Sequence, residues 1–196
     1  MSKPEFAVRL RGDGDSNYID LVSGNTWGVI GTSSTVKTDV GRFGGKALKF
    51  GDYELQIKSA SKQILATGDF TISLWMKSST TRQVPFVIAT PGIGSGACLR
   101  LLAKDNNLSI SNAYISTDAA HSSTRVVSAK TTNDGNWHHI AIVKDTANQI
   151  KLYVDGEYQG YTTYGMTTNI IASDVFTIGG HRLESTNTSL LYDGLI

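Results

Sequence analysis

The sequence predicts an all-β protein that folds as a sandwich of antiparallel sheets. Three observations support this class: short segments alternate apolar and polar residues, Gly, Asn, Asp and Ser separate the segments, and no long segment has helical periodicity. The chain has 196 residues, of which 40% are hydrophobic, enough for one domain with its own core. We expect a single domain over residues 1–196, with a piece of a longer chain as the alternative.

The clearest strand is predicted over residues 70–77. Alternate positions in it carry only apolar residues, namely Phe70, Ile72, Leu74 and Met76. Because successive side chains of a strand point to opposite faces, this set should face the core. The opposite face is half polar yet holds Trp75, as expected of a sheet surface that lines a groove or is covered by a loop.

A hairpin is predicted farther along the chain. Residues 150–154 and 157–159 flank Asp155 and Gly156, and residues 137–144 precede them as another alternating segment. Asp followed by Gly between two strands favours a type I′ turn, in which both residues have positive φ. The residues that we expect between the two sheets are Phe70, Ile72, Leu74, Leu152, Val154 and Ile178.

Other short strands complete the pattern. We expect them at residues 6–10, 47–50, 53–57, 86–89, 99–103, 108–110, 125–128 and 175–178. Many short strands at this spacing, with no helices between them, are typical of a sandwich of antiparallel sheets.

Several segments together resemble a known family. Residues 68–77 (GDFTISLWMK), 137–141 (WHHIA) and 152–156 (LYVDG) are similar, in order and spacing, to laminin-G-like, concanavalin A-like jelly-roll domains of the type found in bacteriophage virion and bacterial surface proteins. Residues 43–50 and 176–180 fit the flanking strands of these domains. The resemblance implies an antiparallel jelly-roll sandwich. This fold carries lectins, adhesion modules, glycanases and virion parts, so the function must be argued from the residues.

The resemblance also bears on the last strand. In the family this strand continues for several residues beyond the position of Ile196. The resemblance therefore implies either a piece of a longer protein or a neighbouring subunit that covers the edge, because an uncovered edge invites aggregation. We further expect residues 6–10 to lie beside residues 191–196.

Composition argues against several classes of partner. The formal net charge is +1 and no run of Lys and Arg occurs, so a nucleic acid is not expected. No apolar stretch approaches the roughly 20 residues of a membrane span, and the first residues lack the apolar core of a signal peptide. The low charged fraction of 18% and the 20 Gly favour a virion or extracellular location, reached without a signal peptide in this chain.

Catalysis has little support in the sequence. Glycanases that share the resemblance place two glutamates and an aspartate at alternating positions of one strand, and retaining hydrolysis needs two carboxyl groups about 5 Å apart. We find no such strand and predict that the protein is not an enzyme, with a glycoside hydrolase as the least favoured alternative. His138 and His139 should point to opposite faces, which favours packing and hydrogen bonding over a shared zinc ion.

A cluster of oxygen ligands lies near the N-terminus. The residues are Asp13, Asp15, Asn17 and Asp20. Calcium prefers such oxygen ligands, and laminin-G-like domains often carry a structural calcium ion. We expect no cofactor and a solvated turn at these residues, with a structural calcium ion there as the alternative.

Aromatic residues are the main indication of a binding site. Trp75, Tyr158, Tyr161 and Tyr164 are the candidate ligand-binding residues. Sugars present apolar faces that stack on Trp and Tyr rings, while exposed tyrosines also serve protein interfaces or cap a core.

Two functions are consistent with these observations. The first is a non-catalytic, lectin-like recognition module that binds a glycan or surface polymer as part of a phage tail or virion appendage. The second is a structural or adhesion domain that makes protein contacts with other subunits of a virion or surface assembly.

Overall fold

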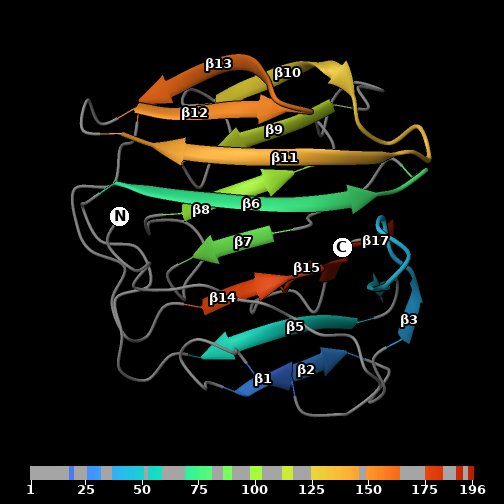
Figure 1. Cartoon of the computed structure of the whole chain (residues 1–196). Coiled ribbons are helices and arrows are strands. Elements are labelled where there is room, and N and C mark those ends of the chain that lie inside the picture. Colours follow the sequence, from blue (N-terminus) through green and yellow to red (C-terminus); the bar gives the residue numbers. More distant parts are fainter. Residues whose placement is uncertain are drawn as a thin grey trace, which may run out of the picture.

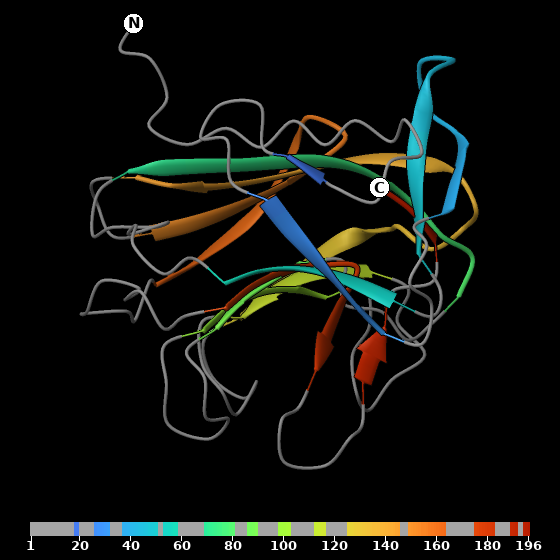
Figure 2. The same cartoon turned by 90° about the horizontal axis from the view of Figure 1, so that it is seen from below.

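The computed structural model describes residues 18–19, 26–31, 37–50, 53–58, 69–80, 86–89, 98–102, 112–116, 125–145, 149–163, 175–182, 189–191 and 194–196. Within these ranges the regular structure is β-strand, and all the pairings between strands are antiparallel. Two large sheets lie face to face, which Figure 2 shows edge-on as an upper and a lower layer. The predicted all-β sandwich is confirmed.

One sheet has eight strands in the described part of the chain (Figure 1). Its spatial order is β1 (Tyr18–Ile19), β2 (Thr26–Gly31), β5 (Tyr53–Lys58), β14 (Val175–Ile178), β7 (Phe86–Ala89), β8 (Cys98–Leu102), β9 (Asn112–Ser116) and β10 (Arg125–Thr131).

The other sheet has seven strands in the same described ranges. Its order is β13 (Glu157–Thr163), β12 (Gln149–Val154), β11 (Trp137–Lys144), β6 (Phe70–Lys77), β17 (Gly194–Leu195), β4 (Lys46–Phe50) and β3 (Lys37–Val40). A small separate pair is formed by β15 (Gly180–Arg182) and β16 (Ser189–Leu191).

Strands β6, β7, β11 and β14 have the predicted bounds, and β6 and β11 show the clearest alternation. Strands β1, β2, β3 and β9 were not predicted, because they are short or rich in Gly, Thr and Lys and lack a clear alternation of apolar and polar residues. The predicted strands at residues 6–10 and 108–110 lie outside the described residues, as does the expected contact of residues 6–10 with the chain end.

The best-buried part of the core lies beneath β11 and β12. Both strands alternate regularly between buried and half-buried residues. Their inward-facing apolar side chains, which are at most 1% exposed, are Ile140, Ile142, Ile150, Leu152 and Val154. Burial of Leu152 and Val154 is therefore confirmed.

Strand β6 is less deeply buried than predicted. Phe70, Ile72 and Leu74 occupy the inward-facing positions but are only half-buried, and so is Ile178. Met76, near the end of the strand, has no exposed surface. In the described part of the chain, β17 pairs with β6 only through Leu195 and Lys77, so the well-buried end of β6 is the end with a strand on both sides.

Two features depend on glycine. Asp155 and Gly156 have φ of 53° and 80°, which confirms the predicted turn with two positive φ values. Gly179 has φ of 83°, and a Cβ atom at this position would overlap the ring of the buried Phe50. Glycine is therefore required where the chain leaves β14 and passes against the core.

Candidate functional site

The outer face of the seven-stranded sheet is the candidate site. We define it by the side chains that cross-strand register places on one side of β6, β11, β12 and β13: Thr71, Ser73, Trp75, Lys77, Trp137, His139, Ala141, Val143, Lys151, Tyr153, Tyr158 and Tyr161. All of them are half-buried or exposed, whereas the residues between them in β11 and β12 are buried. The face thus carries no part of the deeply buried core.

An aromatic cluster occupies one end of this face. Trp75 of β6 lies opposite His139 of β11, and their ring centroids are 5.1 Å apart. The ring of Phe43 meets the Trp75 ring edge to face at 5.5 Å. Phe43 is 77% exposed, so the cluster has an apolar surface open to solvent. We call Phe43, Trp75 and His139 the tryptophan cluster.

The turn between β3 and β4 supplies Phe43 and also Arg42. The backbone N–H of Gly44 donates to the carbonyl oxygen of Gly41, and the N–H of Gly41 donates to the carbonyl oxygen of Gly45, which closes the turn. The Arg42 guanidinium lies 5.4 Å from the Phe43 ring centre and 5.3 Å from that of Trp75, within the range of a cation–π interaction. Figure 2 shows this hairpin standing away from the two layers.

Tyrosines occupy the other end of the face. The rings of Tyr153 and Tyr158 are 5.5 Å apart, and Tyr158 and Tyr161 are 53% and 54% exposed. Three steps between neighbouring strands separate β6 from β13. At about 4.8 Å per step, Tyr158 and Tyr161 lie roughly 14 Å or more from Trp75. We call Tyr153, Tyr158 and Tyr161 the tyrosine cluster.

A β-bulge brings Tyr158 and Tyr161 to the same side. On a regular strand, residues three positions apart point to opposite faces. Here Leu152 pairs with Gly160 and Tyr153 pairs with Tyr158, which leaves Gln159 as an extra residue. Tyr161 then pairs with Lys151, on the same face as Tyr153.

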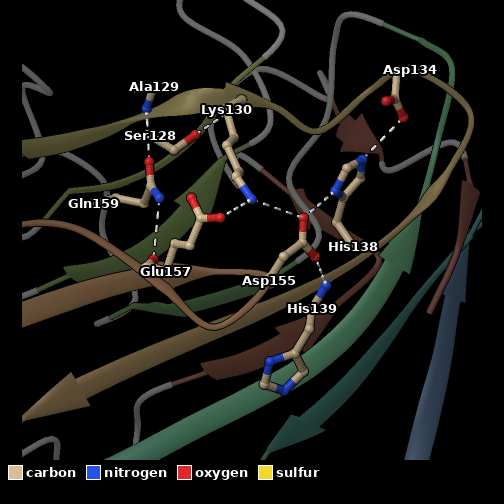
Figure 3. A network of polar contacts seen from close by, with 9 residues as sticks. All are labelled: Ser128, Ala129, Lys130, Asp134, His138, His139, Asp155, Glu157 and Gln159. Atoms are coloured by element: carbon tan, nitrogen blue, oxygen red, sulfur yellow. Dashed lines mark hydrogen bonds and ion pairs between the residues drawn. The ribbon is translucent and has the colours of Figure 1, made fainter.

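Contacts of the extra residue hold this bulge (Figure 3). The Gln159 Oε1 atom accepts a hydrogen bond of 3.0 Å from the backbone N–H of Ala129, and its Nε2 donates to the Glu157 carbonyl oxygen at 3.1 Å. Gly160 follows with φ of 134°, and a Cβ atom there would lie 2.9 Å from Val126. Strand β10 therefore packs against the bulge and stabilises it.

A polar network lies at the end of β11 nearest the tryptophan cluster (Figure 3). The buried His138 ring directs Nδ1 to Asp155 at 2.9 Å and Nε2 to Asp134 at 3.0 Å. The second carboxylate oxygen of Asp155 accepts the backbone N–H of His139 at 2.9 Å. His138 thus points inward and His139 outward, which confirms the predicted packing and hydrogen-bonding roles.

The network shifts the pKa values of its ionisable members. Burial opposes protonation of His138, but the two carboxylates outweigh it and raise the pKa of the imidazole. The hydrogen bond from His138, with help from the backbone N–H of Asn136, lowers the pKa of Asp134 to about 2. Burial raises the pKa of Asp155, yet His138 and the His139 N–H more than offset this and leave it below its usual value.

Two carboxylates meet one lysine beside this network, a pairing that the sequence interpretation overlooked. Asp155 and Glu157 are two residues apart, and their oxygens lie 3.9 and 2.9 Å from the Lys130 ammonium. The pair belongs to the hairpin turn, since Asp155 has positive φ. The two-residue spacing in the sequence was the available signal.

The structure places three of the four predicted ligand-binding residues on one face, in two separate clusters. Trp75, Tyr158 and Tyr161 share the outer face, and Tyr164 lies outside the described residues. Arg42, Phe43, Tyr153 and His139 join them without having been predicted as ligand-binding residues. Phe43 had been expected in a strand, and its place in an exposed turn shows only in three dimensions.

The predicted calcium ligands cannot be placed on this surface. Asp13, Asp15, Asn17 and Asp20 all lie outside the described residues, so both the solvated turn and the alternative of a calcium ion stay predictions. Among the residues that are described, no group of three or more His, Cys, Asp and Glu side chains could hold a metal ion. No helix in the described ranges has the length and hydropathy of a membrane span.

The fold is a β-sandwich of two antiparallel sheets, with exposed aromatic side chains on the outer face of one of them. The chain belongs to the concanavalin A-like lectin/glucanases superfamily, because the laminin-G model of that superfamily matches residues 51–196. No curated protein sequence matches the chain.

Solved structures share the fold at low sequence identity. Domain 4 of AbnA, an extracellular arabinanase from Geobacillus stearothermophilus, superposes with a TM-score of 0.63 and 14% identity, over 90% of this chain and 82% of that one. The binding domain of Paraclostridial Mosquitocidal Protein 1 gives 0.57 and 16%, over 93% and 46%. The LG1-3 region of the laminin alpha2 chain gives 0.54 and 17%, over 72% and 28%.

Proposed function

We propose that this domain is a non-catalytic recognition module that binds a glycan along the outer face of the seven-stranded sheet. The observation that carries the proposal is the presence of two exposed aromatic clusters on that one face. Pyranose and furanose rings have apolar faces that stack on aromatic side chains, and their hydroxyls bond to polar groups nearby. Ser73, two residues before Trp75 on the same face of β6, supplies such a hydroxyl.

Two solved structures with a similar fold support this proposal. Domain 4 of the arabinanase was solved in complex with arabinotriose, and the mosquitocidal protein contributes a binding domain. In both, a sandwich of this shape forms one part of a larger protein. A recognition domain within a larger protein is the role that we propose here.

The carboxylates of the hairpin turn support a non-catalytic role. A general acid in glycoside hydrolysis needs a raised pKa, whereas the pKa of Asp155 is lowered. Both oxygens of Asp155 already accept hydrogen bonds, and Glu157 is paired with Lys130. We therefore propose that the domain releases no reducing ends from a polysaccharide that it binds.

A second candidate is a domain that makes protein contacts within a virion or another surface assembly. Val40 and Phe43, at the projecting hairpin, are 70% and 77% exposed, and exposed apolar residues at a projecting tip also suit a protein partner. An extracellular or virion setting fits both candidates. Binding to a glycan with the isolated domain separates the first candidate from the second.

A glycan array with the purified domain tests the proposal. We expect binding to a restricted set of glycans, and at least a tenfold loss on Trp75→Ala or Tyr158→Ala, equivalent to about 1.4 kcal/mol. Thr131→Ala, at an exposed position of β10 in the other sheet and outside the candidate site, is the matched control. Absence of glycan binding, or full binding by both aromatic variants, would overturn the proposal.

A further inference from the structure

We propose that the glycan bound at the tryptophan cluster carries carboxylate groups, and that Arg42 and Lys77 bind them. This inference rests on the proposed function and names the chemical class of its ligand. It depends on where the unpaired positive charges of the outer face lie.

Arg42 is held in place but not neutralised. Its guanidinium lies over the rings of Phe43 and Trp75, at 5.4 and 5.3 Å from their centres. Arg42 is exposed and forms no ion pair with any residue in the described ranges. A guanidinium stacked on an aromatic ring keeps its N–H groups available at the edge, where they can bind both oxygens of a carboxylate.

Lys77 places a second positive charge on the same side of the cluster. It follows Trp75 by two residues in β6, so both side chains point outward. Lys77 likewise has no ion pair within the described part of the chain. Asp39 is close enough to interact electrostatically with Lys77, but it accepts the Val40 backbone N–H at 2.8 Å and forms its ion pair with Lys49, at 3.5 Å. Lys77 therefore keeps its charge available to a ligand.

The other end of the face differs in its electrostatics. Lys151, beside the tyrosine cluster, is paired with Asp145 at 2.5 Å, and Lys130 is paired with Glu157 at 2.9 Å. Among the described residues, Arg42 and Lys77 near Trp75 have no ion pair, whereas Lys151 and Lys130 near the tyrosines are paired. This asymmetry favours a ligand with anionic groups at one end and neutral sugar rings at the other.

An aromatic ring beside a positive charge indicates the chemical class of the ligand. An aromatic surface alone stacks any sugar, and a cationic surface alone binds any polyanion. Phe43 is 77% exposed and Arg42 lies 5.4 Å from its ring centre, so a pyranose that stacks on the open side of Phe43 would bring its carboxylate within reach of the guanidinium. Complementary charges of this kind set specificity more than overall affinity, and salt weakens them.

The test uses matched pairs of glycans. Uronate- and sialate-containing glycans are arrayed, each beside its carboxyl-reduced counterpart, which keeps the ring and loses the charge. We expect the acidic member of the bound pair to bind at least tenfold more tightly. Arg42→Gln and Lys77→Gln should each shrink this ratio severalfold, and raising the salt concentration should shrink it as well.

A paired lysine on the same face provides the control. Lys151→Gln removes a charge that Asp145 already compensates, so the preference for the acidic member should persist. Equal binding of acidic and reduced members, or a preference for sulfated glycans that lack carboxylates, would overturn the inference and leave the proposed function standing. If no glycan binds at all, the proposed function itself fails.

Discussion

The imidazole Nδ1 of His138 lies 2.9 Å from Oδ2 of Asp155, seventeen residues later in the chain. This contact joins the start of β11 to the turn between β12 and β13. The other ring nitrogen faces a second carboxylate, that of Asp134. Because ionised carboxylates only accept hydrogen bonds, this arrangement favours the imidazolium form, in which both ring nitrogens donate, and, against the opposing effect of burial, it raises the pKa of His138.

Stability should therefore depend on the protonation of His138. The pKa of His138 is raised in the folded state, so its contribution is fully present below its unfolded value of about 6.5 and is lost as the pH rises through the folded pKa. We expect the difference in unfolding free energy between the wild type and His138→Gln to shrink as the pH rises above about 6.5. Urea denaturation at several pH values measures this difference. Parallel stability curves for the two proteins would contradict the prediction.

Asp134 should show the opposite pH dependence. Its pKa is lowered to about 2, so its contribution is present above the unfolded value near 3.8 and is lost as the pH falls towards 2. Asp134→Asn should cost about 1 kcal/mol or less near neutral pH, because the pair is partly exposed and screened. Thermal unfolding between pH 2 and pH 6 should show the two proteins converging at the acid end. A constant gap down to pH 2 would count against this role.

The stability lost when a core side chain is truncated should increase with the burial of that side chain in the seven-stranded sheet. Leu152 has no exposed surface, so Leu152→Ala should cost roughly 2–5 kcal/mol. Leu74 is half-buried, so Leu74→Ala should cost clearly less than Leu152→Ala. Chemical denaturation of both variants gives the comparison. An equal or larger loss at Leu74 would mean that β6 carries more of the core than its burial indicates.

Gly179 should tolerate no side chain. A Cβ atom would overlap the ring of Phe50, and the positive φ adds backbone strain, so Gly179→Ala should cost about 2–4 kcal/mol. Gly45→Ala is the control, since nothing lies within 4 Å of its Cβ position. This control should change stability by less than about 0.5 kcal/mol. Melting temperatures of the two variants by circular dichroism provide the check.

The sequence predicted the bounds of the strands correctly where apolar and polar residues alternate regularly. Strands β6 and β11 have their predicted bounds, because a buried face and an exposed face leave a period of two in the sequence. The turn at Asp155 and Gly156 was also predicted correctly, since few residue pairs adopt two positive φ values. Local chemistry therefore predicted the strands and the turn between β12 and β13.

The candidate site was less predictable, because it depends on contacts between distant segments. The spacing of Tyr158 and Tyr161 implies opposite faces on a regular strand, and only the register with β12 reveals that they share one. Phe43 and Trp75 are 32 positions apart in sequence and meet only through the sheet order. No local pattern encodes such contacts.

The bulge at Gln159 also separates the tip of the hairpin from the body of β13. The extra residue is accommodated where it occurs, so Gly160 and the residues after it keep their partners along β12. A change in the number of residues at the tip need not reverse the orientation of Tyr161. The tip can therefore vary in length between related proteins, or accept a grafted loop, while the rows of side chains farther along the sheet stay in place.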